Sequence, residues 1–440
     1  MKVLIISSVG DAGELDLCLK AQGSGHEVVW AFTPTERTKY IGKDMVKRVD
    51  DWRGWMRWAD LVILGDNTKY LRELDGWRQR EDIRIIGATT EAAAWELDRN
   101  LGQRVFERAG IETVPYKEFK SYDEAIRYVE KNGVRYACKP CGDEPDKSLS
   151  YCAKSPEDMI YMLQKWKKAK RHKGSFILQD FIPGIEMAVG GFFGPGGFNE
   201  GWWENWEEKQ LMAGGTGPAT GEQGTTIRVV KKSKLADKVL CPLEDQLEAV
   251  GYCGYVDVNC IIDDKGNPWP LEFTMRFGWP TINIQQELFE GDIIEWLAGL
   301  GQGRDVRRLK LNGLALGVTV AIPDYPYKTI PIDKAVGVPV YGITPSLHPH
   351  IHPCMMMWGD APQETNGKII QAPMPLTAGD YVLIATGSGR TVREAQSRAY
   401  NVTKKLKIPS SPFWRPDIGS RLKKQLPELQ RMGYATGMAY

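Results

Sequence analysis

The 440-residue sequence lacks several features that would assign it to particular protein classes. No stretch approaches the roughly 18 uninterrupted apolar residues of a membrane span, so we expect none. The formal net charge is only +1, which excludes a strong overall attraction to nucleic acid or to an anionic membrane. Cysteine is scarce, with eight residues, and no basic-then-apolar leader precedes the first apolar run, so we expect reduced thiols and a cytoplasmic protein.

The sequence does contain the alternating strands and helices of an α/β protein. Hydrophobic residues make up 42% and charged residues 26% of the chain, which is typical of globular proteins. Apolar runs at 2–8, 26–32, 61–65 and 83–87 indicate buried strands, and 14–22 has the spacing of a helix. This pattern predicts a parallel, doubly wound sheet, with ligands beyond the C-terminal ends of its strands.

Residues 254–274 carry acidic side chains on what we predict to be a β-hairpin. The period of two places Asp257 and Asn259 on one face of the first strand, and Glu272 and Thr274 on one face of the second. Mg²⁺ prefers carboxylate oxygens and usually reaches a protein through one or two of them plus nucleotide phosphates. The alternative is an ordinary hairpin with solvated acids, and the spacing alone favours neither interpretation.

Two further patterns are also open to two interpretations. His348, His350 and His352 alternate, so on a strand their imidazoles would share a face and could bind a metal, but a His-rich loop is favoured. The basic, Trp-rich stretch 37–58 and the indoles at 201–206 could stack on nucleic acid bases. Core packing of these tryptophans is the favoured interpretation.

Several short motifs occur in an order known from one enzyme family. Residues 271–278 read Leu-Glu-Phe-Thr-Met-Arg-Phe-Gly, and 216–224 read Thr-Gly-Pro-Ala-Thr-Gly-Glu-Gln-Gly. They resemble the Glu-Phe-Asn-x-Arg-Phe-Gly signature and the Thr-Gly-Pro-Asn-Thr-Gly-Gly-Met-Gly loop of phosphoribosylamine–glycine ligase, an ATP-grasp family. The opening strand, the turn and helix at 86–94, and the C-terminal motifs at 391–400 and 415–421 also match. The chain therefore resembles a divergent member over nearly its whole length.

The resemblance implies an α/β fold with a two-lobed ATP-grasp core. We expect an N-terminal Rossmann-like domain at 1–99 and a small, lid-like lobe at 100–185. A large lobe with the magnesium site would span 186–312, and a small C-terminal α+β domain would span 313–440.

The resemblance also implies a nucleotide site between the two lobes. Lys139 would reach the phosphates, and Arg99 stands where the family has a lysine of similar role. Glu186 would contact the ribose, and Lys147 lies in a phosphate-covering loop that is poor in glycine and rich in acids. The hinge residues that would contact adenine are Gln179, Asp180, Phe181 and Ile182.

The chemistry implied by the resemblance needs a metal, cations and two substrates. Glu272 and Thr274, the latter in place of an asparagine, would bind Mg²⁺ or Mn²⁺, and Asp257 would add a carboxylate. Arg276 would hold the acyl phosphate or the substrate carboxylate, and Lys209 matches a lysine in a family loop. Lys139, Lys209 and Arg276 are the predicted catalytic residues.

The acceptor site departs most from the family. Its phosphate-binding glycine-rich turn with an arginine is here Gly10-Asp11, so a negative charge replaces a positive one. A phosphate would then need Lys69 or Arg72, or the acceptor would not be phosphoribosylamine. The other predicted substrate-binding residues are Asp66, Asn67, Thr216, Gly217, Pro218 and Gly221, the last four on a loop.

We therefore expect an ATP- and Mg²⁺-dependent carboxylate–amine ligase that forms an amide through an acyl phosphate. The leading reaction joins glycine to phosphoribosylamine, giving glycinamide ribonucleotide. One alternative keeps the chemistry and uses another amine, such as one on a modified nucleoside or nucleic acid base. Another is a degenerate ATP-binding protein without ligase activity. We expect small-molecule substrates, no membrane partner and a monomer or dimer.

Overall fold

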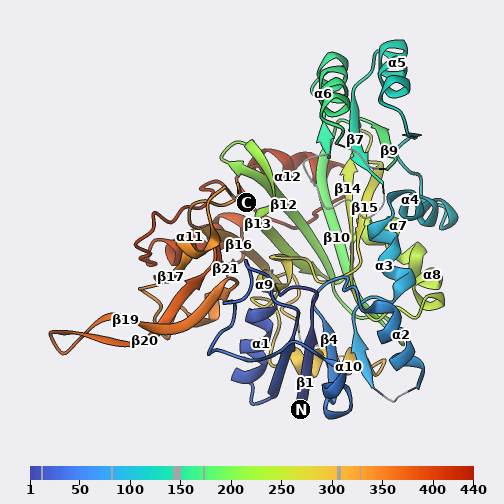
Figure 1. Cartoon of the computed structure of the whole chain (residues 1–440). Helices are drawn as coiled ribbons and strands as arrows, with labels where there is room; N and C mark the ends of the chain where they lie inside the picture. The colour runs from blue at the N-terminus through green and yellow to red at the C-terminus, as the bar shows by residue number, and fades with distance from the viewer. Residues whose placement is uncertain (11–12, 81–82, 142–149, 172–173, 305–308, 328) are drawn as a thin grey trace.

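The N-terminal part of the chain is a parallel sheet of five strands in the order β3-β2-β1-β4-β5 (Figure 1). We describe it from a computed structural model, which defines residues 1–10, 13–80, 83–141, 150–171, 174–304, 309–327 and 329–440. The strands are β1 (Lys2–Ile6), β2 (Glu27–Ala31), β3 (Lys47–Val49), β4 (Leu61–Leu64) and β5 (Arg84–Ile86). The helices are α1 (Glu14–Gly23), the 3₁₀ helix η1 (Arg53–Trp58), α2 (Leu71–Arg80), α3 (Thr90–Leu97) and α4 (Arg99–Arg108). The predicted doubly wound sheet is confirmed.

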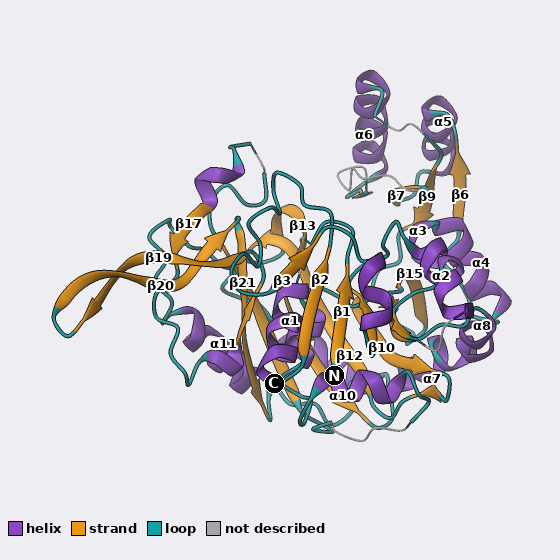
Figure 2. Cartoon of the chain, turned by 60° about the horizontal axis from the view of Figure 1, so that its bottom comes forward, coloured by secondary structure: helices purple, strands orange, loops and turns teal. Residues whose placement is uncertain are grey.

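A small lobe projects from the body of the molecule (Figures 1 and 2). Its antiparallel sheet has the order β6-β9-β7-β8 and is packed against two helices. Ser121 and Ser155 cap those helices through their hydroxyls, and Gly133 ends the first with a φ of 62°. The elements are β6 (Tyr116–Phe119), α5 (Tyr122–Asn132), β7 (Tyr136–Pro140), β8 (Tyr151–Cys152), α6 (Pro156–Ala169) and β9 (Phe176–Asp180).

The centre of the molecule is a nine-stranded sheet whose main path is β15-β14-β10-β12-β13-β16-β21-β18, with β11 paired to β10. Its first strands are β10 (Ile185–Gly194), β11 (Gly197–Phe198), β12 (Trp202–Met212), β13 (Thr216–Val230), β14 (Gly254–Ile262) and β15 (Pro268–Thr274). Its last strands are β16 (Leu314–Ala321), β18 (Ile351–Pro353) and β21 (Tyr381–Gly389). The predicted division between 312 and 313 therefore falls within one continuous sheet.

Short helices and one long hairpin complete the fold. The helices are α7 (Lys234–Val239), η3 (Cys241–Leu243), α8 (Glu244–Ala249), α9 (Thr281–Gln285), α10 (Ile293–Leu300), η4 (Ile332–Ala335), η5 (His348–His350), α11 (Val392–Thr403) and α12 (Leu422–Arg431). A fourth sheet, β17-β20-β19, contains a hairpin that extends far from the body (Figures 1 and 2). Its strands are β17 (Val336–Pro339), β19 (Met356–Thr365) and β20 (Lys368–Ala378). Among the described residues, no helix combines the length and apolar composition needed to cross a membrane.

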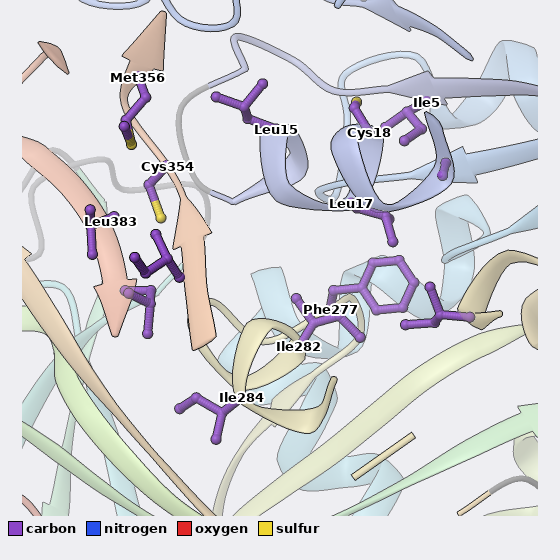
Figure 3. Packing of buried hydrophobic residues seen from close by; sticks show 14 of the residues in the cluster. Ile5, Leu15, Leu17, Cys18, Phe277, Ile282, Ile284, Cys354, Met356 and Leu383 are labelled. Carbon is purple, nitrogen blue, oxygen red and sulfur yellow. The ribbon is translucent and has the colours of Figure 1, made fainter. Parts of the chain in front are cut away.

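The hydrophobic core joins the N-terminal sheet to the C-terminal strands. Figure 3 shows Leu17 of α1 pointing toward Phe277, with Ile282, Cys354 and Leu383 in the same cluster. The indoles of Trp52, Trp203 and Trp206 are at most 1% exposed, so these tryptophans belong to the core as favoured. Trp55 and Trp58 are half-buried at the edge of a core cluster. This packing fixes the carboxyl edge of the parallel sheet against the segment that follows β15.

Candidate active site

The predicted acidic hairpin is formed by β14 and β15, and its pairing places the candidate metal ligands side by side. Asp257 pairs with Thr274, and Asn259 pairs with Glu272. Paired residues of antiparallel strands point to the same face, so all four side chains share one face of the large sheet. The prediction from the period of two is confirmed.

Lys209 is the central cation of this face. Its Nζ lies 2.9 Å from Glu207 Oε2, 3.4 Å from Glu186 Oε1 and 3.7 Å from Glu272 Oε1. Burial alone would lower the pKa of Lys209, but the three carboxylates raise it well above its usual range. Lys209 therefore stays charged and holds strands β10, β12 and β15 together electrostatically. The family-like loop predicted around it is instead part of β12, which pairs with β13 beyond residue 209.

Arg99 approaches the same carboxylates from α4, and Lys139 approaches them from β7 of the small lobe. Arg99 Nη1 forms a hydrogen-bonded ion pair with Glu272. Burial would raise the pKa of Glu272, but Arg99, Lys209 and Lys139 hold it well below its usual range. Lys139 Nζ is buried and has no hydrogen-bond partner among the described residues. Burial and the charge of Arg99 lower the pKa of Lys139 to about 8.

Two neighbouring acids have no such cation. Asp257 is 4% exposed, and its Oδ2 accepts hydrogen bonds from Asn205 Nδ2 at 2.8 Å and Tyr255 OH at 2.9 Å. Burial and the charge of Glu207 raise the pKa of Asp257 to about 7. Burial, and then the charge of Glu207, also raise the pKa of Glu222 well above its usual range. The carboxyl groups at this end therefore repel one another, and Lys209 only partly offsets the rise in their pKa values.

The predicted adenine hinge lies between the lobes, but two of its amides are already engaged. The Asp180 amide donates to Pro115 O at 2.9 Å, and the Phe181 amide donates to Arg135 O at 3.0 Å. Burial raises the pKa of Asp180. Adenine would thus meet other atoms of the segment that ends at Ile182, with Gln179 buried on β9. Lys147 lies outside the described residues, as does the loop around it.

Glu186 follows the hinge on β10 and contacts Asn259 and Lys209 of the charged face. Its Oε1 accepts a hydrogen bond from Asn259 Nδ2 at 3.0 Å in addition to the contact with Lys209. Burial would raise the pKa of Glu186, but Lys209 and Arg421 lower it. A ribose contact by Glu186 stays a prediction.

The carboxyl edge of the parallel sheet holds the predicted acceptor residues. Asp66 Oδ2 accepts a hydrogen bond from the Ser8 amide at 2.9 Å, which ties the ends of β1 and β4 together. Gly10 has a φ of +67°, and an added Cβ would lie 2.8 Å from the Phe32 ring, so glycine is required there. Asp11 lies outside the described residues. The proposed phosphate contact Lys69 lies 5.1 Å above the Tyr70 ring.

Arg276 lies at this edge, among carboxylates. Its Nε is 3.2 Å from Glu96 Oε1, and Glu96 Oε2 accepts hydrogen bonds from Asn67 Nδ2 at 2.9 Å and the Met275 amide at 2.7 Å. Glu96 raises the pKa of Arg276, with smaller contributions from Asp66 and Glu14. Arg276 is therefore available to an anion only in competition with these acids.

The predicted substrate loop at 216–221 is instead the start of strand β13. Gly214 and Gly215 adopt left-handed φ angles of +72° and +69° and close the turn between β12 and β13, so the strand begins at Thr216. Thr216, Gly217 and Gly221 are exposed and Pro218 is half-buried. These residues form an exposed hairpin, and their role in substrate binding stays a prediction.

Two of the alternating histidines make separate polar contacts with different parts of the fold. His352 is fully buried, with Nδ1 2.9 Å from Asp16 Oδ2 and Nε2 3.0 Å from Thr386 Oγ1. His350 Nδ1 lies 2.6 Å from Glu287 Oε1. His350 and His352 therefore serve different partners, and the strand-face geometry considered for a metal is wrong because 348–350 form a 3₁₀ helix.

The charged face fits magnesium and a nucleotide. The unpartnered, buried ammonium of Lys139 matches an anionic phosphate, and the excess of carboxylates matches a divalent cation. Within the described ranges, no three His, Cys, Asp or Glu side chains form a ready-made metal cage. Mg²⁺ does not need one, because it is commonly held by one or two carboxylates and phosphates.

The sequence interpretation missed several members of this site. Asn205, Glu207 and Glu222 lie on strands β12 and β13, far along the chain from the metal hairpin. Arg421 donates to Glu207 O at 3.0 Å from near the C-terminus. The alternation of Asn205, Glu207 and Lys209 was the available signal, since it predicts one shared strand face.

Comparisons with known proteins agree with this architecture. A scan against models of known protein families finds no match. Phosphoribosylamine–glycine ligase of Leptospira interrogans serogroup Icterohaemorrhagiae serovar Lai is 23% identical over 384 residues, covering 82% of this chain and 83% of the relative. The crystal structure of phosphoribosylamine–glycine ligase from Thermotoga maritima has a TM-score of 0.70 at 21% identity, covering 95% of this chain and 100% of that chain.

A further similar structure contains a nucleotide. It is the biotin carboxylase domain of Hydrogenobacter thermophilus 2-oxoglutarate carboxylase in complex with MgADP, ADP and bicarbonate. Its TM-score is 0.61 at 15% identity, with 98% of each chain covered. The ATP-grasp fold is thus confirmed, and the chain is similar over most of its length to phosphoribosylamine–glycine ligases, as its motifs indicated.

Proposed function

We propose that this protein is an ATP- and Mg²⁺-dependent carboxylate–amine ligase that joins glycine to phosphoribosylamine. The observation that carries the proposal is the convergence of Arg99, Lys139 and Lys209 on Glu272 and Glu186 between the two lobes. Alternating cations and carboxylates suit a triphosphate and its metal. The motif order and the relatives supply glycine and phosphoribosylamine as the substrates.

The reaction needs positioning and charge neutralisation rather than a side-chain nucleophile. The substrate carboxylate attacks the γ-phosphorus, ADP leaves, and the acceptor amine then displaces phosphate from the acyl carbon. Lys139 and Arg99 would neutralise the phosphate oxygens, and Lys209 would hold the carboxylate near them. Glu272, Thr274 and Asp257 would hold Mg²⁺, which supplies charge stabilisation when bound.

The proposed substrate positions divide between two parts of the molecule. The nucleotide and the amino acid would occupy the charged face of the large sheet, between the lobes at 100–185 and 186–312. The acceptor would lie at the carboxyl edge of the parallel sheet, near Gly10, Asp66 and Asn67, with Arg276 between the two. The packing of α1 against the segment after β15 supports this arrangement because it brings the two regions together.

The test is incubation with Mg-ATP, glycine and freshly made phosphoribosylamine, followed by mass spectrometry of ADP and glycinamide ribonucleotide. Omission of each substrate in turn provides the controls. We expect both products only in the complete mixture. ADP formed with other amines but without the ribonucleotide would indicate a different acceptor. ATP binding without ADP release would contradict the ligase proposal.

A further inference from the structure

Four side chains converge on the small residue Ala188 in the centre of the large sheet. Ala188 of β10 pairs with Asn259 of β14 on one side and with Asn205 of β12 on the other. Asp257 and Glu207 stand two residues from these asparagines and therefore on the same face. The methyl group of Ala188 leaves the space above it to these larger neighbours.

The hydrogen bonds confirm that the four side chains meet across Ala188. Asn205 Nδ2 donates to Asp257 Oδ2 at 2.8 Å, which links β12 to β14. Asn259 Nδ2 donates to Glu207 Oε2 at 3.2 Å, so this second link between the strands has its donor on β14 and its acceptor on β12. Both amides thus turn their nitrogen atoms toward carboxylates.

Three oxygen atoms on this part of the sheet face have no hydrogen-bond partner among the described residues. Asn205 Oδ1 and Asn259 Oδ1 are buried and have no hydrogen-bond partner within the described part of the chain, and these residues are 1% and 5% exposed. Glu222 is 7% exposed, and its Oε1 is likewise buried and unpartnered. Unpartnered buried acceptors are costly, so these oxygens call for a donor, and the neighbouring carboxyl groups favour one that carries positive charge.

The nearest cation, Lys209, pairs with Glu207 of this group but leaves the other acids without a direct ion pair among the described residues. Lys209 contacts Glu207, Glu186 and Glu272 and makes no direct contact with Asp257 or Glu222 that the described residues show. Glu207 Oε2 receives both Lys209 Nζ and Asn259 Nδ2. Negative and positive groups therefore stand side by side, which is complementary to a small zwitterion.

The geometry points to an ammonium-binding subsite formed by Asn205, Glu207, Glu222 and Asn259, which holds the α-ammonium of a small amino acid. An ammonium offers three N–H donors and no acceptor, and it matches the three unpartnered oxygens. The carboxylate of the same molecule would then lie toward Lys209. Mg²⁺ fits less well, because it keeps several waters and this group is nearly excluded from solvent.

This subsite deepens the proposed function and rests on it for the identity of the substrate. Glu222 is the discriminating residue, because it adds a carboxylate where the similar family motif has glycine. An uncharged or N-acylated analogue would leave the carboxylate oxygens of Glu222 on β13 and Glu207 on β12 unpaired. The subsite would therefore reject such an analogue.

Isothermal titration with the full chain and Mg-ADP tests the subsite without turnover. Glycine, acetate and N-acetylglycine are titrated into wild type, Glu222→Gln and the matched control Glu364→Gln, an exposed residue of β19. We expect the Kd of the wild type for glycine to be lower than its Kd for acetate by a factor on the order of 10 to 100, since only glycine has an ammonium that can donate charged hydrogen bonds. Glu222→Gln should weaken the binding of glycine by a similar factor and leave the binding of acetate unchanged. Glu364→Gln should change the binding of neither ligand.

Several outcomes would overturn the subsite. Equal binding of glycine and acetate by wild type would do so without any variant, even where Glu222→Gln fails to fold. Equal weakening of both ligands in Glu222→Gln would indicate a structural role, and a change only in Mg²⁺ dependence would indicate a metal. Failure of the proposed ligase is a separate result: preserved glycine discrimination without ADP release would retain the subsite and reject the ligase.

Discussion

The two charged regions of this molecule differ in their ratio of cations to carboxylates. On the face of the large sheet around Glu272, Arg99, Lys139 and Lys209 approach Glu186, Glu207 and Glu272, so cations and carboxylates are closely matched there, and the excess of acids lies at Asp257 and Glu222. At the carboxyl edge of the parallel sheet, the single guanidinium of Arg276 is influenced by three carboxylates, those of Glu96, Asp66 and Glu14. The first region suits a nucleotide and its metal. The second departs from what a sugar phosphate requires, so the proposed nucleotide site keeps more of what the similarity to phosphoribosylamine–glycine ligases implies than the proposed acceptor site does.

Glu272→Gln should break the matched region most severely. It leaves Arg99 without its carboxylate partner and removes a proposed magnesium ligand. We expect ligase activity to fall by a factor on the order of 10² to 10³, as for loss of a key electrostatic group. Steady-state ADP release measures the loss, and Glu364→Gln on the exposed hairpin is the matched control. Retention of more than half the activity would show that the acid hairpin does not hold the metal.

Lys139→Met should weaken nucleotide binding next. Its buried ammonium has no protein partner among the described residues, so its loss removes a phosphate contact without breaking a structural one. We expect the Kd for Mg-ATP to rise on the order of 10- to 100-fold. Fluorescence titration of the tryptophans measures it, with Lys131→Met on the exposed end of α5 as the control. An unchanged Kd would remove Lys139 from the nucleotide site.

The same lysine gives the matched region a pH signature. Its pKa in the folded, ligand-free protein is about 8, below the usual value of 10.5. Between these two values the unfolded chain binds a proton that the folded chain does not, so stability should rise with pH. Mg-ATP affinity should fall over the same window, because the ammonium is lost. Denaturant unfolding of wild type and Lys139→Met at several pH values should show a difference that changes only within this window.

The sequence was informative wherever local periodicity determines structure. The strands of the parallel sheet, helices α5 and α6, and the shared face of Asp257, Asn259, Glu272 and Thr274 all follow from spacing and capping. The strand character of 216–221 was missed because its pairing partner lies across a glycine turn, and glycines within the run resemble a loop. Glu96, Asn205 and Glu222 were missed because long-range packing, which a single sequence does not encode locally, brings them to the site.

Asp16→Asn should test how the acceptor region is held in place. Asp16 is 1% exposed, and its Oδ2 accepts hydrogen bonds from Asn283 Nδ2 at 3.0 Å and Gln286 Nε2 at 2.6 Å and lies 2.9 Å from His352 Nδ1. These contacts join α1 to α9 and β18. We expect a loss of about 2 kcal/mol in the free energy of unfolding, since a buried charged acceptor is replaced. Urea unfolding at pH 7 measures it.

The control for this variant is Asp245→Asn, an exposed acid in the first turn of α8 that matches the position of Asp16 in α1. Burial would raise the pKa of Asp16, but the charge and hydrogen bond of His352 lower it overall. The stabilisation should therefore be complete at neutral pH and be lost only as pH falls through the acid range. Equal stability of the two variants would show that α1 is positioned by apolar packing alone.

Glu96→Gln should give the smallest effect and sharpen the contrast between the regions most directly. It removes one negative charge 3.2 Å from Arg276 Nε while keeping the side-chain size. If phosphoribosylamine is the acceptor, its KM should fall by about 3- to 10-fold, because Arg276 is released toward the phosphate and a repulsive charge is removed. Glu91→Gln, exposed on the same helix α3, should leave KM unchanged. A rise in KM for Glu96→Gln would mean that the acid attracts the acceptor, and would favour a cationic amine without phosphate.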